Sequence, residues 1–137
     1  MESGIQPNQL PQKQSQKEII YKELSFKIVG VLFSVHNELG RFEKEKRYSD
    51  LTELKLGEAN LQYRRELNIG SNANIADFII ENLILLELKA KPSILKEDFR
   101  QIQNYLQKSQ LKLGIIANFR NRYLKPVRII RINKFKQ

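Results

Sequence analysis

Three ionisable side chains interrupt the most apolar part of the sequence, the stretch NIADFIIENLILLELKAK from Asn74 to Lys91. Asp77, Glu87 and Lys89 stand in segments that otherwise have the composition of buried strands. Charges are costly in such segments unless they are paired or bind a ligand. Two converging carboxylates repel each other unless a cation lies between them, and carboxylate oxygens suit Mg²⁺ or Mn²⁺. The pattern therefore favours a divalent-metal site with a lysine beside it.

The spacing of these residues supports their convergence. NIADFII and LILLELKA read as two strands around the short turn at Glu81 and Asn82, so an antiparallel hairpin is expected. Strand side chains alternate, which puts Glu87 and Lys89 on one face and allows Asp77 to lie alongside Glu87. The lysine could orient or deprotonate water, or stabilise charge on a phosphate. Structural ion pairs at strand ends, or an ordinary exposed face of the sheet, would produce the same pattern without any catalytic or metal-binding role.

Two helical segments offer further candidates. Gln101 and Tyr105 lie four residues apart, so they share a helix face, offset from the expected packing stripe of Phe99, Ile102 and Leu106. An amide and a phenol there could hold water, a phosphate or the lysine. Upstream, Glu45 could bring a third carboxylate to the same cation. Alone, each is typical of an ordinary surface or boundary residue.

The elements that must position these residues follow from periodicity and turn signals. We expect the α/β class, with a mixed β-sheet flanked by helices. Residues 1–16, rich in glutamine, are predicted to be a disordered leader, and 17–137 a single domain. Gly70, Ser71 and Asn72 are expected to form a turn. The predicted helices are 17–39, 41–57 and 96–109, and the predicted strands are 61–70, 74–80, 83–90, 112–119 and 126–135.

Composition excludes several classes of protein. The chain has 137 residues, 41% hydrophobic and 28% charged, which is ordinary for a globular domain. It contains no cysteine, so disulfide scaffolds, thiolate zinc sites and cysteine nucleophiles are excluded. No apolar run is long enough for a membrane span or a signal peptide, so we expect a cytoplasmic protein with no membrane partner.

The positive charge is concentrated at the C-terminal end. The formal net charge is +9, and the part from Arg100 onward has ten lysines and arginines but no aspartate or glutamate. Such a segment can attract phosphate groups without regard to base sequence. It therefore indicates a nucleic-acid partner, although a solvated basic surface would have the same composition.

Taken together, the chain resembles the GxxExxY protein family, a compact branch of the PD-(D/E)XK nuclease-like superfamily. The resemblance covers roughly residues 20–132, and the order of its motifs is more specific than any one of them. It departs from the family pattern where Phe42 replaces a glycine, Gly40 lying two positions earlier, and where Ala76 replaces a proline. The matching residues are Gly40, EKRY (Glu45–Tyr48), Asp77, ELK (Glu87–Lys89), QIQNY (Gln101–Tyr105) and KLGIIANF (Lys112–Phe119).

The resemblance implies a restriction-endonuclease-like core and hydrolysis of phosphodiester bonds in DNA or RNA. A divalent ion, Mg²⁺ or Mn²⁺, would be bound by acidic side chains and a backbone carbonyl, while Lys89 assists hydrolysis. Gln101 and Tyr105 would match the glutamine-tyrosine motif of related exonucleases. The implied metal ligands are Asp77, Glu87, the carbonyl of Leu88, and Glu45.

Two alternatives stay open at this point. A catalytically inactive nucleic-acid-binding or protein-interaction module could keep the same fold, because one scaffold supports many functions. The short chain also has no evident specificity domain, so we expect action with a partner, either a homodimer or another protein.

Overall fold

The computed structural model describes residues 19–68 and 75–133. The predicted leader at 1–16 and the predicted turn at Gly70–Asn72 lie outside these residues. No described helix has the length and apolar character needed to cross a membrane. The described elements are α2 (Lys22–Leu39), α3 (Glu45–Glu58), β1 (Tyr63–Asn68), β2 (Ile75–Ile80), β3 (Ile84–Lys89), α4 (Lys96–Ser109), β4 (Leu113–Asn118) and β5 (Val127–Ile130).

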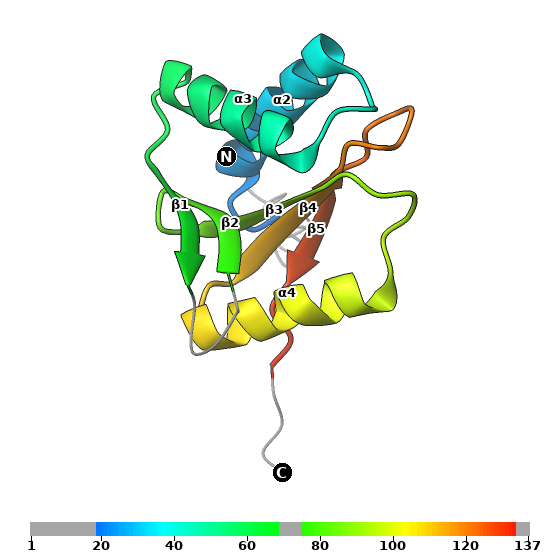
Figure 1. Ribbon diagram of the computed structural model, residues 1–137. Helices are drawn as coiled ribbons and strands as arrows, with labels where there is room; N and C mark the ends of the chain where they lie inside the picture. The colour runs from blue at the N-terminus through cyan, green and yellow to red at the C-terminus, as the bar shows by residue number, and fades with distance from the viewer. Residues whose placement is uncertain (1–18, 69–74, 134–137) are drawn as a thin grey trace, which may run out of the picture.

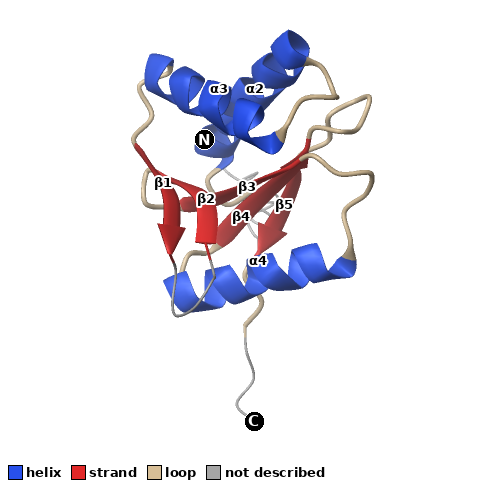
Figure 2. Cartoon of the chain, in the orientation of Figure 1, coloured by secondary structure: helices blue, strands red, loops and turns tan. Residues whose placement is uncertain are grey.

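The strands form one mixed sheet in the order β1-β2-β3-β4-β5. Neighbouring strands are antiparallel except β3 and β4, which are parallel and joined through α4, as a parallel connection requires. Helices α2 and α3 cover one face of the sheet and α4 covers the other (Figures 1 and 2). The predicted α/β class with a restriction-endonuclease-like mixed sheet is therefore confirmed.

The hairpin of β2 and β3 forms as predicted. Glu81 and Asn82 both have positive φ, 55° and 57°, and the N–H of Leu83 donates to the carbonyl of Ile80 at 2.9 Å, so two residues reverse the chain. The alternation of β3 divides its side chains between two cores. Its even-numbered apolar residues pack beneath α2 and α3, whereas Leu85 packs against α4. Glu87 and Lys89 follow Leu85 on the α4 side.

The second helix begins at Glu45 rather than at the predicted Arg41. Gly40 ends α2 with a φ of 77°, which favours glycine, and Lys44 is still extended before α3 begins. Tyr48 fastens the intervening loop because its buried hydroxyl donates to the carbonyl of Gly40 at 2.6 Å and accepts from the N–H of Glu43 at 3.1 Å. The loop is thus held by side-chain contacts that the helical pattern did not indicate.

Replacing Tyr48 with phenylalanine should lower the free energy of unfolding by about 1–2 kcal/mol, because the Gly40 carbonyl and the Glu43 N–H lose their partner. Urea unfolding with both proteins at the same pH measures this difference. The exposed Tyr123 provides a control, since its change to phenylalanine should shift stability by less than about 0.5 kcal/mol. Equal values for the two variants would contradict the fastening role.

Candidate active site

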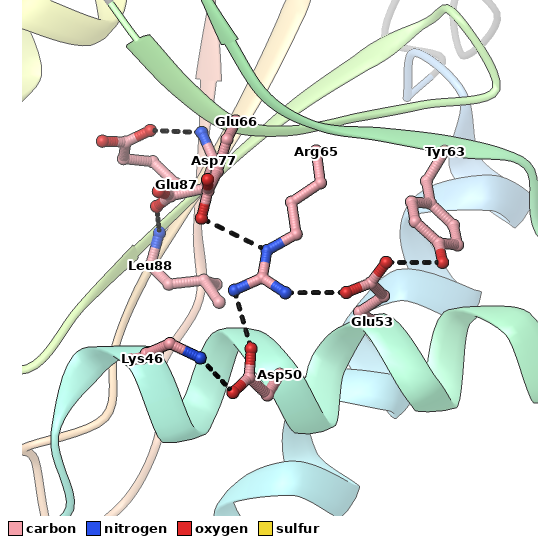
Figure 3. Close-up of polar contacts among 9 residues, drawn as sticks. All are labelled: Lys46, Asp50, Glu53, Tyr63, Arg65, Glu66, Asp77, Glu87 and Leu88. Carbon is pink, nitrogen blue, oxygen red and sulfur yellow. Dashed lines mark hydrogen bonds and ion pairs between the residues drawn. The ribbon is translucent and has the colours of Figure 1, made fainter.

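Two carboxylates meet where β2 and β3 separate. The ladder pairs Phe78 with Leu86, so the next residues along, Asp77 and Glu87, face each other across the strands. Oε1 of Glu87 accepts from the N–H of Asp77 at 3.4 Å, and Oδ2 of Asp77 accepts from the N–H of Leu88 at 2.7 Å (Figure 3). The structure therefore brings the two predicted carboxylates together between interior strands of the sheet.

Both carboxyl groups are held in an environment that disfavours their charge. Glu87 is only 5% exposed, and its burial together with the charge of Asp77 raises its pKa to about 8. Burial also raises the pKa of Asp77 to about 6, against the hydrogen bond from Leu88, and the charge of Glu45 adds to the rise. Two acids with raised pKa values are typical of functional sites.

Lys89 lies between two acids on the α4 side. Its Nζ is 3.6 Å from Oε2 of Glu87 and 3.9 Å from Oδ1 of Asp98, and its side chain is 18% exposed. The other oxygen of Asp98 pairs with Lys91 at 2.7 Å and accepts from the N–H of Leu95 at 2.7 Å. This places the ammonium of Lys89 directly beside the carboxylate pair.

Asp98 was not among the predicted site residues. It stands in the first turn of α4 and reaches back to the residue before the helix, which is half of a capping box. Burial of Asp98 favours a higher pKa, but the hydrogen bond from Leu95 and the ion pair with Lys91 outweigh it and lower the pKa of Asp98. An acid at the third position of the helix was the signal in the sequence, but it does not reveal the contact with Lys89.

The participation of Glu45 in a metal site with Asp77 and Glu87 stays a prediction. Among residues 19–68 and 75–133, no group of three or more His, Asp or Glu side chains could hold a metal ion. Glu45 is exposed at the first position of α3, which packs on the opposite face of the sheet from α4. Its influence on Asp77 is electrostatic, through the raised pKa of that carboxyl group. Helical spacing alone did not indicate which layer α3 would join.

The two predicted site residues of α4, Gln101 and Tyr105, differ in burial. Tyr105 is 2% exposed and packs in the α4 core with Ile102 and Leu106, whereas Phe99 is 36% exposed. The predicted packing stripe was therefore wrong in including Phe99 and leaving out Tyr105. Gln101 lies one turn before Tyr105 and is half-buried. A role for Gln101 and Tyr105 in the reaction stays a prediction.

An arginine on β1 pairs with two acids of α3 and with its neighbour Glu66 (Figure 3). Arg65 approaches Asp50 at 2.9 Å and Glu53 at 2.7 Å, both on α3, and its Nε lies 3.5 Å from Glu66. Glu66 has a φ of 54° in the middle of β1, a strained value for glutamate, and its charge further raises the pKa of Asp77. Sequence reasoning missed both Arg65 and Glu66, because strand alternation does not predict a left-handed residue.

The donor set fits a hard divalent cation. Asp77 and Glu87 supply carboxylate oxygens from adjacent strands, and burial raises the pKa of both groups although the charge of Lys89 opposes the rise. A cation between them would relieve their repulsion and the burial of negative charge. The chemistry of two carboxylates and a nearby backbone carbonyl matches the oxygen ligands of Mg²⁺ and Mn²⁺.

The mixed sheet, the paired acids and the adjacent lysine define a nuclease-like α/β domain. The family model of the PD-(D/E)XK nuclease superfamily matches residues 22–132, and the chain belongs to this superfamily. Nucleases of the superfamily generally use divalent metal ions.

No curated protein matches this chain. Among solved structures, the crystal structure of SSO0001 is similar with a TM-score of 0.42 and 17% sequence identity. The similarity covers 86% of this chain and 80% of that chain.

Proposed function

We propose that this protein is a metal-dependent nuclease of the GxxExxY type, which hydrolyses phosphodiester bonds in DNA or RNA. The observation that carries the proposal is the contact between Asp77 and Glu87, with Lys89 3.6 Å from Glu87. Superfamily membership over residues 22–132 supports it independently of that geometry.

In the proposed mechanism, Asp77, Glu87 and the carbonyl of Leu88 would hold Mg²⁺ or Mn²⁺. When bound, such an ion supplies a Lewis acid for phosphate oxygens and lowers the pKa of water. The hydrogen bond from the Leu88 N–H orients the carboxylate of Asp77. Glu87 also positions the side chain of Lys89. Glu87 would therefore contact both the metal ion and the ammonium of Lys89.

Lys89 would act on the reacting phosphate. Glu87 and Asp98 flank its ammonium, so the lysine can donate a hydrogen bond while it stays close to the carboxylate pair. A donor at this place can hold the attacking water or stabilise the negative charge that develops on phosphate oxygens. In the overall reaction the water oxygen bonds to phosphorus and the bond to one sugar oxygen breaks. The products are a phosphate monoester and a hydroxyl group.

A catalytically inactive nucleic-acid-binding or protein-interaction module is the second candidate. It is favoured by one observation, the lack of a third acidic side chain grouped with Asp77 and Glu87 in the described part of the chain. Both candidates use the basic C-terminal part, where Arg100 and the residues after it include no acid. A homodimer or a protein partner is compatible with either candidate, and we place the protein in the cytoplasm.

Metal dependence separates the two candidates. We expect cleavage of labelled DNA or RNA with Mg²⁺ or Mn²⁺, and none in EDTA, when duplex, single-stranded and structured substrates are tested together. The ions should also raise the melting temperature of the wild-type protein, because they bind the folded state. Glu87→Gln should abolish most of that rise. Salt-sensitive binding without cleavage, and without a metal-dependent change in melting, would identify the inactive module instead.

A further inference from the structure

Two loops meet at the end of the sheet where β3 and β4 finish. One loop, 40–44, joins α2 to α3, and the other, 119–126, joins β4 to β5, and they lie side by side in Figure 1 as the cyan and orange loops. Nε of Arg41 donates to the carbonyl of Arg120 at 2.9 Å and links them. Residues more than 75 positions apart in the sequence thus form one surface.

This surface presents two aromatic rings to solvent. Phe42 is 75% exposed and Tyr123 is 68% exposed. The guanidinium carbon of Arg41 lies 4.8 Å from the centre of the Phe42 ring, and that of Arg120 lies 5.9 Å from it. The guanidinium carbon of Arg122 lies 5.3 Å from the centre of the Tyr123 ring. Aromatic rings combined with arginines are the groups on which unpaired bases stack.

Hydrogen bonds join the second loop to the end of β3, the strand that carries Glu87 and Lys89. Lys89 pairs with Asn118 at the end of the parallel ladder, and the N–H of Phe119 donates to the carbonyl of Lys89 at 2.8 Å. Nη2 of Arg120 reaches the carbonyl of Ala90 at 3.3 Å. Because Ala90 directly follows Lys89, a strand of nucleic acid bound on the loops would lie at the end of the strand that carries the proposed catalytic lysine.

Contacts from the helices hold both loops in place. Nε2 of His36 lies 3.2 Å from the carbonyl of Phe119 and 3.0 Å from that of Asn121, so its N–H faces two acceptors of the second loop. The ring of Phe119 stacks on Tyr48 with centres 4.3 Å apart, and Tyr48 also holds Gly40. A surface fixed in this way loses little conformational entropy when a ligand binds.

We infer that Phe42 and Tyr123, with the arginines beside them, form a stacking platform for unpaired nucleotides, so that the substrate is single-stranded nucleic acid or a single-stranded part of a larger molecule. This inference rests on the proposed nuclease function and narrows its substrate class. The bases of an intact duplex are stacked on one another and would not reach the rings, whereas the arginines contact phosphates of either form. Loop 119–126 itself includes Arg120, Arg122 and Lys125 and no acidic residue.

The test measures binding without cleavage. A fluorescent single-stranded oligonucleotide, the corresponding blunt duplex and a single strand with abasic sites are titrated with the full chain in EDTA. Wild-type protein is compared with a variant carrying Phe42→Ala and Tyr123→Ala. Phe26→Ala provides the matched control, because Phe26 is 79% exposed on α2, away from both loops. Melting curves check that all three proteins are folded.

We expect the double variant to bind the single strand about 30-fold more weakly than wild type or weaker still, since two bases would each lose the aromatic ring on which they stack. The control variant should bind as wild type does. Abasic sites should weaken binding to wild type and have little effect on the double variant. Wild-type protein should prefer the single strand to the duplex.

Two results would overturn the platform while leaving the nuclease proposal intact. One is equal binding by wild type and the double variant, and the other is equal loss of affinity on abasic substitution in both proteins. Metal-dependent cleavage by wild type, measured separately, tests the proposed function. If wild type bound no oligonucleotide and cleaved none, both proposals would fail together.

Discussion

Glu87→Gln is expected to abolish metal-dependent cleavage and, in the same protein, to stabilise the metal-free fold. The loss of turnover should be about 10³-fold or more, because the amide gives up the charge that would hold the cation and position Lys89. The gain in stability has a separate cause, the removal of a carboxyl group whose charge is disfavoured by burial and by Asp77. Opposite changes in activity and stability are expected where a destabilised group serves the reaction.

The stability gain should depend on pH. In the folded protein the pKa of Glu87 is about 8, against 4.5 for an ordinary glutamate, so the folded state holds this proton more tightly than the unfolded state does. Its stabilising contribution is complete below pH 4.5 and is lost as the pH rises toward 8. In EDTA, the free energy of unfolding of the wild-type protein, relative to that of Glu87→Gln, should therefore fall by about 2 kcal/mol or more between pH 5 and pH 8.

Urea unfolding in EDTA at several pH values measures this difference, and single-turnover cleavage with Mg²⁺ or Mn²⁺ measures the activity. Glu97→Gln makes the same chemical change at an exposed position in the first turn of α4. That control should keep its activity and change stability by less than about 0.5 kcal/mol. Unchanged turnover in Glu87→Gln would reject the proposed active site. No difference in stability at pH 8 would show that Glu87 carries no unfavourable charge there.

Lys89→Met is expected to reduce turnover by about 10²- to 10³-fold, because the methionine keeps much of the aliphatic side chain and loses the ammonium that would act on the phosphate. The rise in melting temperature with Mg²⁺ or Mn²⁺ should remain, since Asp77 and Glu87 are both kept. This combination separates the role of the lysine from that of the proposed metal ligands.

Lys91→Met is the matched control for this substitution. Asp98 is a shared partner of Lys89 and Lys91, and Lys91 pairs with Asp98 at 2.7 Å. Lys91 lies beyond the end of β3 and makes no described contact with Glu87. Its loss should reduce stability slightly and leave turnover within a few-fold of wild type. Equal losses of turnover in the two variants would point to a structural effect through Asp98 rather than to chemistry at Lys89.

The stacking platform and the carboxylate pair suggest a division of roles along the chain. The strands β2 and β3 provide the acids and the lysine, while the loops at the end of the sheet provide aromatic rings and arginines. The EKRY segment contributes to the second group through Tyr48, whose hydroxyl holds loop 40–44. Tyr48 of this segment thus has a structural role in the loop, while a role for Glu45 beside the acids stays a prediction.

Local patterns in the sequence were sufficient for the order of the described elements and for the central pair of acids, although the last strand ends at Ile130, before the end of the predicted range 126–135. Alternation and the Glu81-Asn82 turn set the register of one hairpin, and that register alone puts Asp77 opposite Glu87. The apolar periodicity of α4 likewise predicted its bounds, Lys96–Ser109. These features were predictable because each depends on residues close together in the chain.

What only the tertiary structure decided was how separate layers meet. Glu45 belongs to a helix on the opposite face from α4, Asp98 reaches Lys89 by capping its own helix, and Phe42 meets Arg120 through two distant loops. Helical spacing defines which side chains share a face, but not which face of the sheet that helix covers. That choice comes from burying both apolar sides of the sheet at once, which involves residues from the whole chain.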